Sequence, residues 1–236
     1  MTVSPSTTPA PPATALLHVD VWSDVACPWC FIGKRRFERA LASFEHRDRV
    51  RVTWRSYQLA PDAEVGSTVT EAALLAERKG VPIEAVRQVL DQVTATAAAE
   101  GLTYDFETIR PANTFDALRL VHLAAAVGPD VAADVVEALM TAHFSDGIAV
   151  DDHDELVAIA ERFGMVGADV RAALAGDDAG QAAAAAVRAD IDTARAIGVT
   201  GVPFFALDHR LAVPGAQSSE VFVGALSEAW AGLELA

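Results

Sequence analysis

The chain has 236 residues, of which 52% are hydrophobic, so it is long enough to bury a large core. It carries 18 Lys and Arg against 33 Asp and Glu, and this net charge of -15 argues against electrostatic binding to nucleic acid or to anionic membranes. No apolar run approaches the roughly 20 residues that a membrane-spanning helix needs. We therefore expect a soluble globular protein that binds neither nucleic acid nor membrane.

Residues 1–14 are rich in Pro, Ser, Thr and Ala, a composition that favours extended conformations and offers little apolar surface to bury. The sequence predicts a disordered tail here. The tail has no Lys or Arg and no apolar core of the kind that secretory signal peptides need, so we expect a cytoplasmic protein. In a reducing cytoplasm, a close pair of cysteines is more often redox-active or metal-binding than a structural disulfide.

The next elements predict a strand, a helix and a second strand. Residues 17–23 alternate apolar and polar side chains, which is the period of a strand. Phe37, Leu41 and Phe44 then recur at helical spacing, and residues 50–59 again have strand character. Together these elements predict one parallel strand-helix-strand unit.

Helical patterns dominate residues 67–198. Thr68 and Glu71 have the spacing of a capping box, and Pro82 suits a first helical position. Four glycines are placed as helix stops: Gly80, Gly101, Gly164 and Gly198. We therefore expect several short helices, one after another.

Strand character returns at residues 202–217, which predict two short strands joined through Asp208 and His209, before a closing helix. The order of elements predicts an α/β fold interrupted by an all-helical insertion. In this division, residues 15–66 and 199–236 form the α/β domain, and residues 67–198 form the insertion.

The two cysteines of the chain, Cys27 and Cys30, lie in the motif CPWC where the first strand gives way to the helix. A cysteine attacks as the thiolate, and the unpaired N-H groups of a first helical turn stabilise that anion at Cys27. Pro28 fits there because the N-H it lacks would be unpaired anyway. Cys30 lies about one turn away, within reach of a disulfide. The motif predicts Cys27 as the nucleophile and Cys30 as the resolving cysteine.

Two other interpretations of the pair remain open. A CxxC motif is also a common half of a zinc site, but zinc needs two more ligands. The six histidines show no spacing that would complete such a site: His18, His46, His122, His143, His153 and His209. We therefore predict no metal site. The other alternative is a pair of inert core cysteines, which a proline directly after the first cysteine disfavours.

Several motifs in the chain resemble those of a known family. CPWC after a first strand, with "GVTGVPFF" far downstream, resembles the thioredoxin fold, and the helical insertion resembles the DsbA-like thiol oxidoreductases. The strings "SDVACPWCFIGKRR", "RSYQLAP", "NTFDALRL" and "PGAQ" are similar to the cytoplasmic FrnE-like branch of that family. The resemblance covers residues 16–233 and implies a thioredoxin-like domain for residues 15–66 and 199–236.

The resemblance also implies roles for individual residues. Pro203 matches the family's cis-proline beside the active-site cysteines, and Val202 lies where the backbone is free to pair with an extended substrate. Pro28 and Trp29 are expected to contact substrate. Because Trp29 stands where DsbA has a histidine, Cys27 receives no added positive charge there, and the disulfide is expected to be less oxidising than that of DsbA.

Other matches have two interpretations each. Leu118 replaces a histidine that the FrnE-like pattern usually has, which removes any polar contact through that position. Asn113 and Thr114 either form a polar wall facing the active site or cap a helix. The cluster of Lys34, Arg35 and Arg36 either attracts an acidic substrate such as glutathione or forms a solvated helix face.

The function that this resemblance implies is thiol-disulfide exchange with protein or small-thiol substrates. We expect no tightly bound cofactor, with glutathione as a candidate co-substrate. An alternative is a glutathione-dependent isomerase or transferase, similar to 2-hydroxychromene-2-carboxylate isomerases and kappa-class transferases, which use a serine near the position of Cys27. Retention of both Cys27 and Cys30 favours the first function. A third alternative is a binding module with a vestigial dithiol. The sequence does not indicate the oligomeric state.

Overall fold

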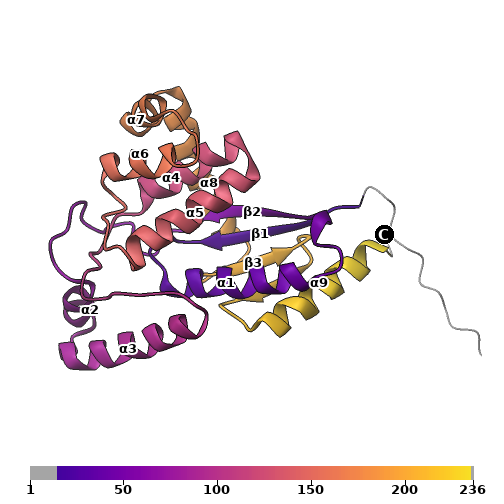
Figure 1. The fold of residues 1–236 in the computed structure, drawn as a ribbon, viewed down its shortest axis with the longest axis horizontal. Helices are drawn as coiled ribbons and strands as arrows, with labels where there is room; N and C mark the ends of the chain where they lie inside the picture. The colour runs from indigo at the N-terminus through magenta and orange to yellow at the C-terminus, as the bar shows by residue number, and fades with distance from the viewer. Residues whose placement is uncertain (1–14, 235–236) are drawn as a thin grey trace, which may run out of the picture.

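The computed structural model describes residues 15–234 and contains one four-stranded sheet (Figure 1). The strands lie in the order β2-β1-β3-β4, with β1 and β2 parallel and the other neighbours antiparallel. Their bounds are β1 Leu17–Ser23, β2 Val50–Ser56, β3 Phe204–Leu207 and β4 Leu211–Pro214. The predicted parallel unit at the start of the chain is confirmed, and the tail predicted for residues 1–14 lies outside the described residues.

Alternation along β1 directs side chains to two different layers of helices. Leu17, Val19 and Val21 are fully buried and belong to the main core, with helices α1 (Pro28–Ser43) and α9 (Ser219–Glu234). On the opposite face, Trp22 packs near Ala194 of helix α8 (Asp178–Ala196). Helices therefore cover both faces of the sheet at β1.

Aromatic rings fill the layer between the sheet and the helices α1 and α9. Phe37 of α1 lies 5.2 Å from Phe205 of β3 and 5.5 Å from Phe222 of α9, measured between ring centroids. All three side chains are nearly inaccessible to solvent. Residues that are far apart in the chain thus share one core and fix the position of α1, whose first turn carries the cysteines.

Seven helices lie between β2 and β3 in the chain, within the described residues, and a short helix η1 (Arg47–Arg49) precedes β2. The seven helices are α2 Glu71–Lys79, α3 Ile83–Ala99, α4 Phe115–Val127, α5 Pro129–Phe144, α6 His153–Glu161, α7 Gly167–Ala175 and α8. Figure 1 shows α4 to α8 gathered on one side of the sheet and α2 with α3 beside the N-terminal end of α1. The α/β fold with an all-helical insertion is confirmed, while the domain boundaries at residues 67 and 198 stay a prediction. None of the helices in residues 15–234 combines the length and apolarity needed to cross a bilayer.

Three local predictions are wrong, for identifiable reasons. Strand β2 ends at Ser56 rather than at residue 59, because its partner β1 ends at Ser23, the residue that pairs with Ser56. Helix α2 is capped by Thr70, whose Oγ1 accepts a hydrogen bond from the backbone N-H of Ala73. Glu71 is therefore the first residue of the helix and not the third, so it does not form a capping box with residue 68. Pro82 precedes α3 with a ψ of 142°, which is an extended conformation and not a helical one. The predicted turn at residues 208 and 209 is confirmed, since both have positive φ.

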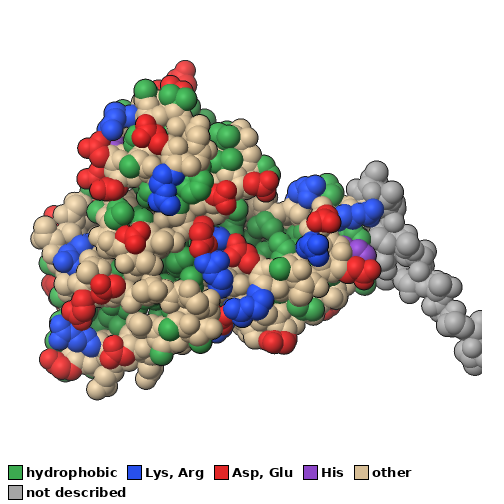
Figure 2. All heavy atoms as spheres, in the orientation of Figure 1, with side chains coloured by type: hydrophobic (Ala, Val, Ile, Leu, Met, Phe, Trp, Pro, Cys, Tyr) green, Lys and Arg blue, Asp and Glu red, His purple; other side chains and the backbone are tan. Residues whose placement is uncertain are grey.

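The basic cluster at residues 34–36 is neither a solvated helix face nor a free anion-binding site, because its side chains form ion pairs within the protein. Lys34 is only 3% exposed, and its Nζ lies 2.5 Å from a carboxylate oxygen of Glu38 and 2.6 Å from one of Glu137 on α5. Arg35 binds the same two carboxylates. Figure 2 shows acidic and basic side chains side by side where α1 meets α5. This network ties the cysteine-bearing helix to the helical insertion.

Arg36 binds two other parts of the chain. Its Nε lies 2.6 Å from Glu100, at the end of α3, and a terminal nitrogen donates to the carbonyl oxygen of Ala216 at 2.7 Å. Arg39 contacts the second oxygen of Glu100 at 2.9 Å. The basic residues after the cysteines therefore position α1 against its neighbours and do not form a free anion-binding surface.

Candidate active site

The first turn of α1 carries both cysteines. Cys27 is the N-cap residue, with φ -93° and ψ 115°, and Pro28 is the first helical residue. The backbone N-H of Cys30 donates to the Cys27 carbonyl oxygen at 3.0 Å, while the Cys27 side chain makes no capping hydrogen bond. The Cys27 sulfur thus lies at the end of the helix where unpaired N-H groups favour an anion.

The two thiols differ in access. Both are buried, Cys27 at 4% exposure and Cys30 at 1%, but only Cys27 lines a surface cavity. Burial raises the pKa of the Cys30 thiol well above its usual value, and the hydrogen bond and charge of Cys27 raise it further. Hydrogen bonds from Ser23 and from the backbone of Asp24 act in the opposite direction. Both cysteines are free, and of the two only Cys27 borders the cavity.

The loop before β3 brings a second part of the chain to the cysteines. The peptide bond between Val202 and Pro203 is cis, and the Val202 carbonyl oxygen lies 3.7 Å from the Cys27 sulfur. The Pro203 carbonyl oxygen accepts from the backbone of Gly215 at 2.8 Å. Val202 therefore lies against Cys27, and Pro203 anchors this loop to the turn after β4.

Gly33 is a site residue that the sequence reasoning missed. A Cβ at this position in α1 would lie 2.8 Å from Cγ of Pro203, closer than packed atoms tolerate, and 3.4 Å from Ala216. Glycine thus allows α1 to approach the proline loop. The signal was present, because a glycine inside a helix lowers its stability and usually has a packing reason.

Gly33→Ala is therefore expected to slow disulfide exchange and to destabilise the fold. Overpacking costs about 1–3 kcal/mol, which the better helix propensity of alanine offsets by about 1 kcal/mol. The displaced Pro203 shifts the Val202 carbonyl away from Cys27. Urea unfolding and exchange rates measure both effects, and Gly224→Ala in α9, where no atom lies within 4 Å of the new Cβ, is the matched control. Equal behaviour of the two variants would contradict a role for Gly33 in this packing.

Asp24 is a second residue that sequence reasoning missed. It is 2% exposed, and one carboxylate oxygen accepts from the backbone N-H of Leu59 at 2.8 Å, while the other accepts from Ala26 at 3.2 Å. Burial raises the pKa of Asp24, and these hydrogen bonds with one from Thr114 oppose the rise. Asp24 thereby fastens the cysteine turn to the segment after β2 and to the start of α4. Its only sequence signal was an acid within the string "SDVACPWC".

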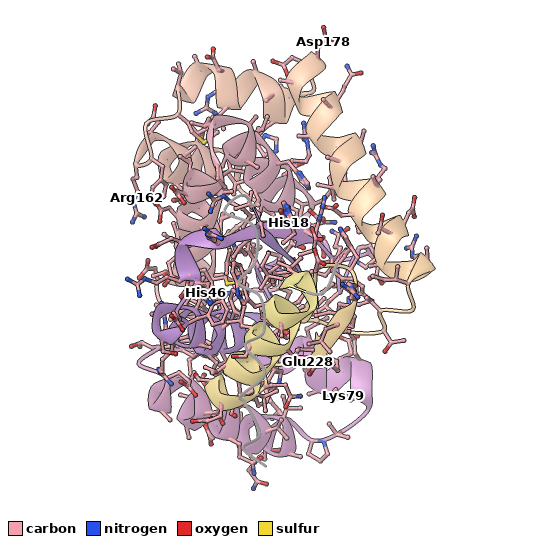
Figure 3. The ribbon with its side chains drawn as sticks, turned by 90° about the vertical axis from the view of Figure 1, so that its right-hand side faces the viewer. His18, His46, Lys79, Arg162, Asp178 and Glu228 are labelled. Atoms are coloured by element: carbon pink, nitrogen blue, oxygen red, sulfur yellow. The ribbon has the colours of Figure 1, made fainter. Side chains whose placement is uncertain are left out.

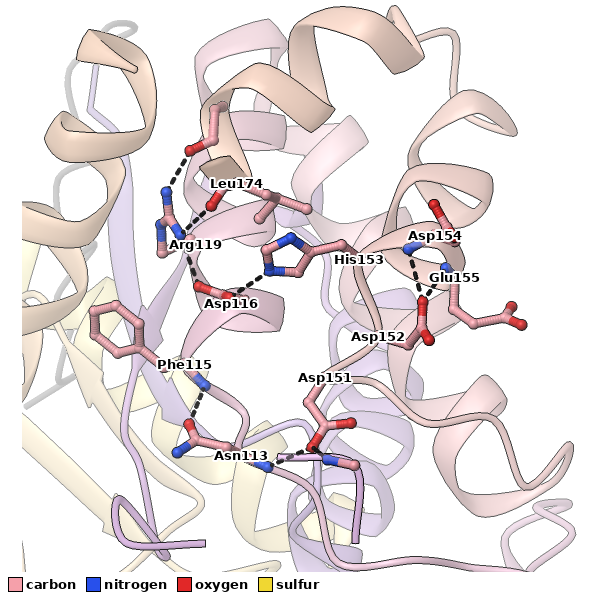
Figure 4. Close-up of polar contacts among 12 residues, drawn as sticks. Asn113, Phe115, Asp116, Arg119, Asp151, Asp152, His153, Asp154, Glu155 and Leu174 are labelled. Atoms are coloured by element: carbon pink, nitrogen blue, oxygen red, sulfur yellow. Dashed lines mark hydrogen bonds and ion pairs between the residues drawn. The ribbon is translucent and has the colours of Figure 1, made fainter. Parts of the chain in front are cut away.

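The motif "NTFDALRL" serves mostly as a scaffold (Figure 4). Asn113 accepts from the backbone of Phe115 at 3.2 Å and donates to the carbonyls of residues 61 and 63, so it fixes a loop and does not line the Cys27 cavity. Thr114 does line this cavity. Leu118 is buried in the apolar core. Farther along α4, Asp116 joins Arg119 to His153 at 2.7 Å each, which ties α4 to α6.

The cavity beside Cys27 has a volume of about 520 Å³ and lies against α2 and α3. Trp29, 42% exposed, and Val202 both line it. Behind the cysteine turn, the hydroxyl of Tyr104 donates to the Pro28 carbonyl oxygen at 2.7 Å, and burial raises the pKa of Tyr104, which keeps this donor neutral. The predicted contact residues therefore lie together around one hollow.

A second cavity, of about 350 Å³, lies over the opposite face of the sheet. Its acids are already paired with neighbouring groups, since Asp20 binds Arg55 at 2.7 Å and Asp190 binds both Arg55 and His122. Within residues 15–234, no group of three or more His, Cys, Asp or Glu side chains is arranged to hold a metal ion. The cavity beside Cys27 is therefore the candidate active site.

Comparisons with known proteins agree with this geometry. The model of the DSBA-like thioredoxin domain family matches residues 18–227. A probable DsbA oxidoreductase from Streptomyces coelicolor is 41% identical, with a TM-score of 0.83 over 91% of this chain and 90% of that one.

Two more distant structures share the fold. The cytosolic disulfide reductase DsbM from Pseudomonas aeruginosa, solved with GSH, is 17% identical, with a TM-score of 0.60 over 92% of this chain and 98% of that one. A 2-hydroxychromene-2-carboxylate isomerase is also 17% identical, with a TM-score of 0.59 over 89% and 95% of the two chains. On the match over residues 18–227 and the placement of its cysteines, this chain belongs to the DSBA-like thioredoxin domain family of thiol-disulfide oxidoreductases.

Proposed function

We propose that this chain exchanges disulfides with protein or small-thiol substrates through Cys27 and Cys30, in the cytoplasm and without a tightly bound cofactor. The observation that carries this proposal is the unequal placement of the two thiols. Cys27 lies at a helix N-terminus and lines a cavity, while Cys30 is enclosed behind it. We assign the chain to the FrnE-like branch on its sequence motifs.

The exchange proceeds in two displacements. The Cys27 thiolate attacks one sulfur of the substrate disulfide, which forms a mixed disulfide and releases the other half as a thiolate that takes up a proton. Cys30 then loses its proton and attacks the Cys27 sulfur, which releases the second half of the substrate as a thiol. The substrate gains two electrons, the protein pair becomes a disulfide, and the reverse sequence oxidises a dithiol.

The direct test is a redox titration of the purified protein in glutathione buffers, quenched with acid, alkylated and weighed by mass spectrometry. A single transition of two thiols supports the proposal and gives the reduction potential. A glutathione adduct on Cys27 in the Cys30→Ser variant identifies the nucleophile. Absence of exchange with any disulfide overturns the proposal in favour of a binding module.

A glutathione-dependent isomerase is the second candidate, and the shared fold of the 2-hydroxychromene-2-carboxylate isomerase is the observation in its favour. Both functions allow glutathione as a co-substrate. They differ in the need for Cys30, because an isomerase that activates bound glutathione has no use for a resolving thiol. Isomerase turnover that survives Cys30→Ser, without thiol exchange, favours the second candidate.

Trp29→His is expected to make the disulfide more oxidising. Trp29 directly precedes Cys30 in the first turn of α1, and an imidazolium there stabilises a thiolate at Cys27 and hence the reduced form. The expected rise in reduction potential is about 30 mV or more, which corresponds to about 1.4 kcal/mol for two electrons. Trp29→Phe is the control, and equal potentials of the two variants would show that charge at this position does not tune the couple.

A further inference from the structure

His143 is an unexplained polar group in the wall of the Cys27 cavity. It lies near the end of α5, is 3% exposed, and its ring meets that of Phe144 at 4.7 Å between centroids. Its Nδ1 is enclosed and has no hydrogen-bond partner within residues 15–234. Burial lowers the pKa of His143 to about 4, so the ring is neutral near pH 7 and offers one donor and one acceptor.

An enclosed polar atom without a partner is costly and needs an explanation. His143 lines the same cavity as Cys27, so a molecule that occupies this cavity can bring a polar atom to the imidazole. None of the proposed exchange steps requires this histidine. The ring is therefore placed to select what binds rather than to perform the chemistry.

The rest of the cavity wall is mostly apolar. It includes Leu74, Leu75, Leu90, Val93, Phe106 and Ile109, which come from α2, α3 and the segment before α4. Its volume of about 520 Å³ lies within the range of small-molecule sites. Shape and lining thus fit the apolar body of a small molecule.

Charged side chains on the cavity wall indicate which charge the bound molecule carries. Arg78 and Lys79, the last two residues of α2, are exposed, line the cavity and form no ion pair within 4.0 Å in the part of the chain that the structure describes. Lys79 is labelled in Figure 3. The acids that line the cavity are Glu71 and the buried Asp24, and burial raises the pKa of both, although the charge of Arg78 and the hydrogen bonds of Asp24 oppose the rise. The two exposed cations, on a chain of net charge -15, favour an anionic occupant.

We propose that this cavity selects a small-molecule disulfide with an apolar body, a carboxylate that reaches Arg78 and Lys79, and a polar substituent that hydrogen-bonds His143. This inference rests on the proposed function, because the ligand sulfur must meet Cys27. Cys27 forms a mixed disulfide with the ligand and releases its other half as a thiol, and Cys30 then releases the bound half as a second thiol. A cellular thiol such as glutathione restores the dithiol.

The test measures the rate at which the reduced protein reacts with three disulfide probes. The first, 5,5′-dithiobis(2-nitrobenzoate), is aromatic and carries carboxylates and nitro groups. The second, 3,3′-dithiodibenzoate, keeps the carboxylates at the same ring position relative to sulfur and lacks the nitro groups. The third, 2-hydroxyethyl disulfide, is small and uncharged and reports exchange chemistry alone. Comparing variants with wild type on each probe cancels the intrinsic reactivity of that probe.

Arg78→Ser with Lys79→Ser is expected to slow both aromatic probes about fivefold, the scale of an exposed charge interaction, and to leave 2-hydroxyethyl disulfide unchanged. The control is Arg162→Ser with Arg171→Ser, which removes the same charge from α7 and the segment after α6, away from the cavity. An equal loss in the control overturns the inference, because it would reflect overall charge.

His143→Phe is expected to slow the nitro probe about fivefold relative to the probe without nitro groups, since only the former loses a hydrogen bond. The phenyl ring keeps the packing against Phe144. Equal rates of this variant and wild type on both probes overturn the role of His143. If no probe reacts with the wild type, the proposed function itself fails, whereas unchanged probe preferences with intact reaction of 2-hydroxyethyl disulfide reject only this inference.

Discussion

Cys27→Ser is expected to reduce disulfide exchange to the rate of the protein-free reaction, whereas Cys30→Ser is expected to keep the first displacement. A serine hydroxyl does not ionise near neutral pH and forms no disulfide, so the first bond cannot form. In Cys30→Ser, the Cys27 thiolate still lies at the N-terminus of α1, but nothing displaces the bound substrate half. The measurement is release of a chromogenic thiol in a stopped-flow instrument.

The two variants distinguish the roles of the cysteines. Cys30→Ser should release one equivalent of thiol per protein and then stop, while the wild type releases two. Intact-mass measurement locates the retained adduct. If Cys27→Ser also released one equivalent, the buried Cys30 would be the nucleophile, and access to the cavity would not decide which thiol reacts first.

The second large effect concerns stability. Replacing both Glu38 and Glu137 with glutamine leaves Lys34 buried at 3% exposure without an opposing charge. Removing the partner of a buried charge typically costs 3–5 kcal/mol, and we expect about 2–3 kcal/mol here because both acids are about one-third exposed. Urea unfolding measures this loss.

Adding Lys34→Met to these two substitutions tests the cause. A methionine of similar length removes the buried charge and is expected to recover most of the lost stability. The exposed pair of Asp154 and Arg171 supplies a control, since Asp154→Asn should change stability by less than about 0.5 kcal/mol. No recovery in the triple variant would mean that packing, rather than charge, accounts for the loss.

The same network gives the stability a defined pH dependence. Burial by itself would raise the pKa of Glu137, but Lys34 and Arg35 outweigh it and hold the pKa below the ordinary value of 4.5. A carboxyl whose folded pKa lies below its unfolded value stabilises the fold above the unfolded value. This contribution is lost as the pH falls below about 4.5 and through the folded pKa. Glu137→Gln should therefore flatten the acid limb of a stability-against-pH curve.

Much of the fold was predictable from sequence because its signals are local. Alternation in residues 17–23 sets the two faces of β1, and the helical spacing that follows sets α1. The junction between these elements, with proline after the first cysteine, locates Cys27 at a helix N-terminus. The helix-rich segment between β2 and β3 likewise follows from periodicity and punctuation.

The predictions that went wrong concern local choices that sequence spacing does not distinguish, and contacts between distant segments. Thr70, rather than residue 68, caps α2, which sequence spacing alone does not distinguish. Lys34 reads as a solvated cation because its partner Glu137 is about a hundred residues away in the chain. Charge and spacing describe a helix face, but they do not say which face another helix covers.

By itself, the sequence determined the strand-helix junction, the dithiol at its helix end and the interrupted α/β order, since each depends on neighbours in the chain. Only the tertiary structure decided that Val202 lies against Cys27, that Gly33 leaves room for the Pro203 ring, and that His143 lines the cavity beside the thiol. These relations join segments separated by more than a hundred residues. They are fixed by the packing of the insertion and the proline loop around α1, and no local pattern encodes that packing.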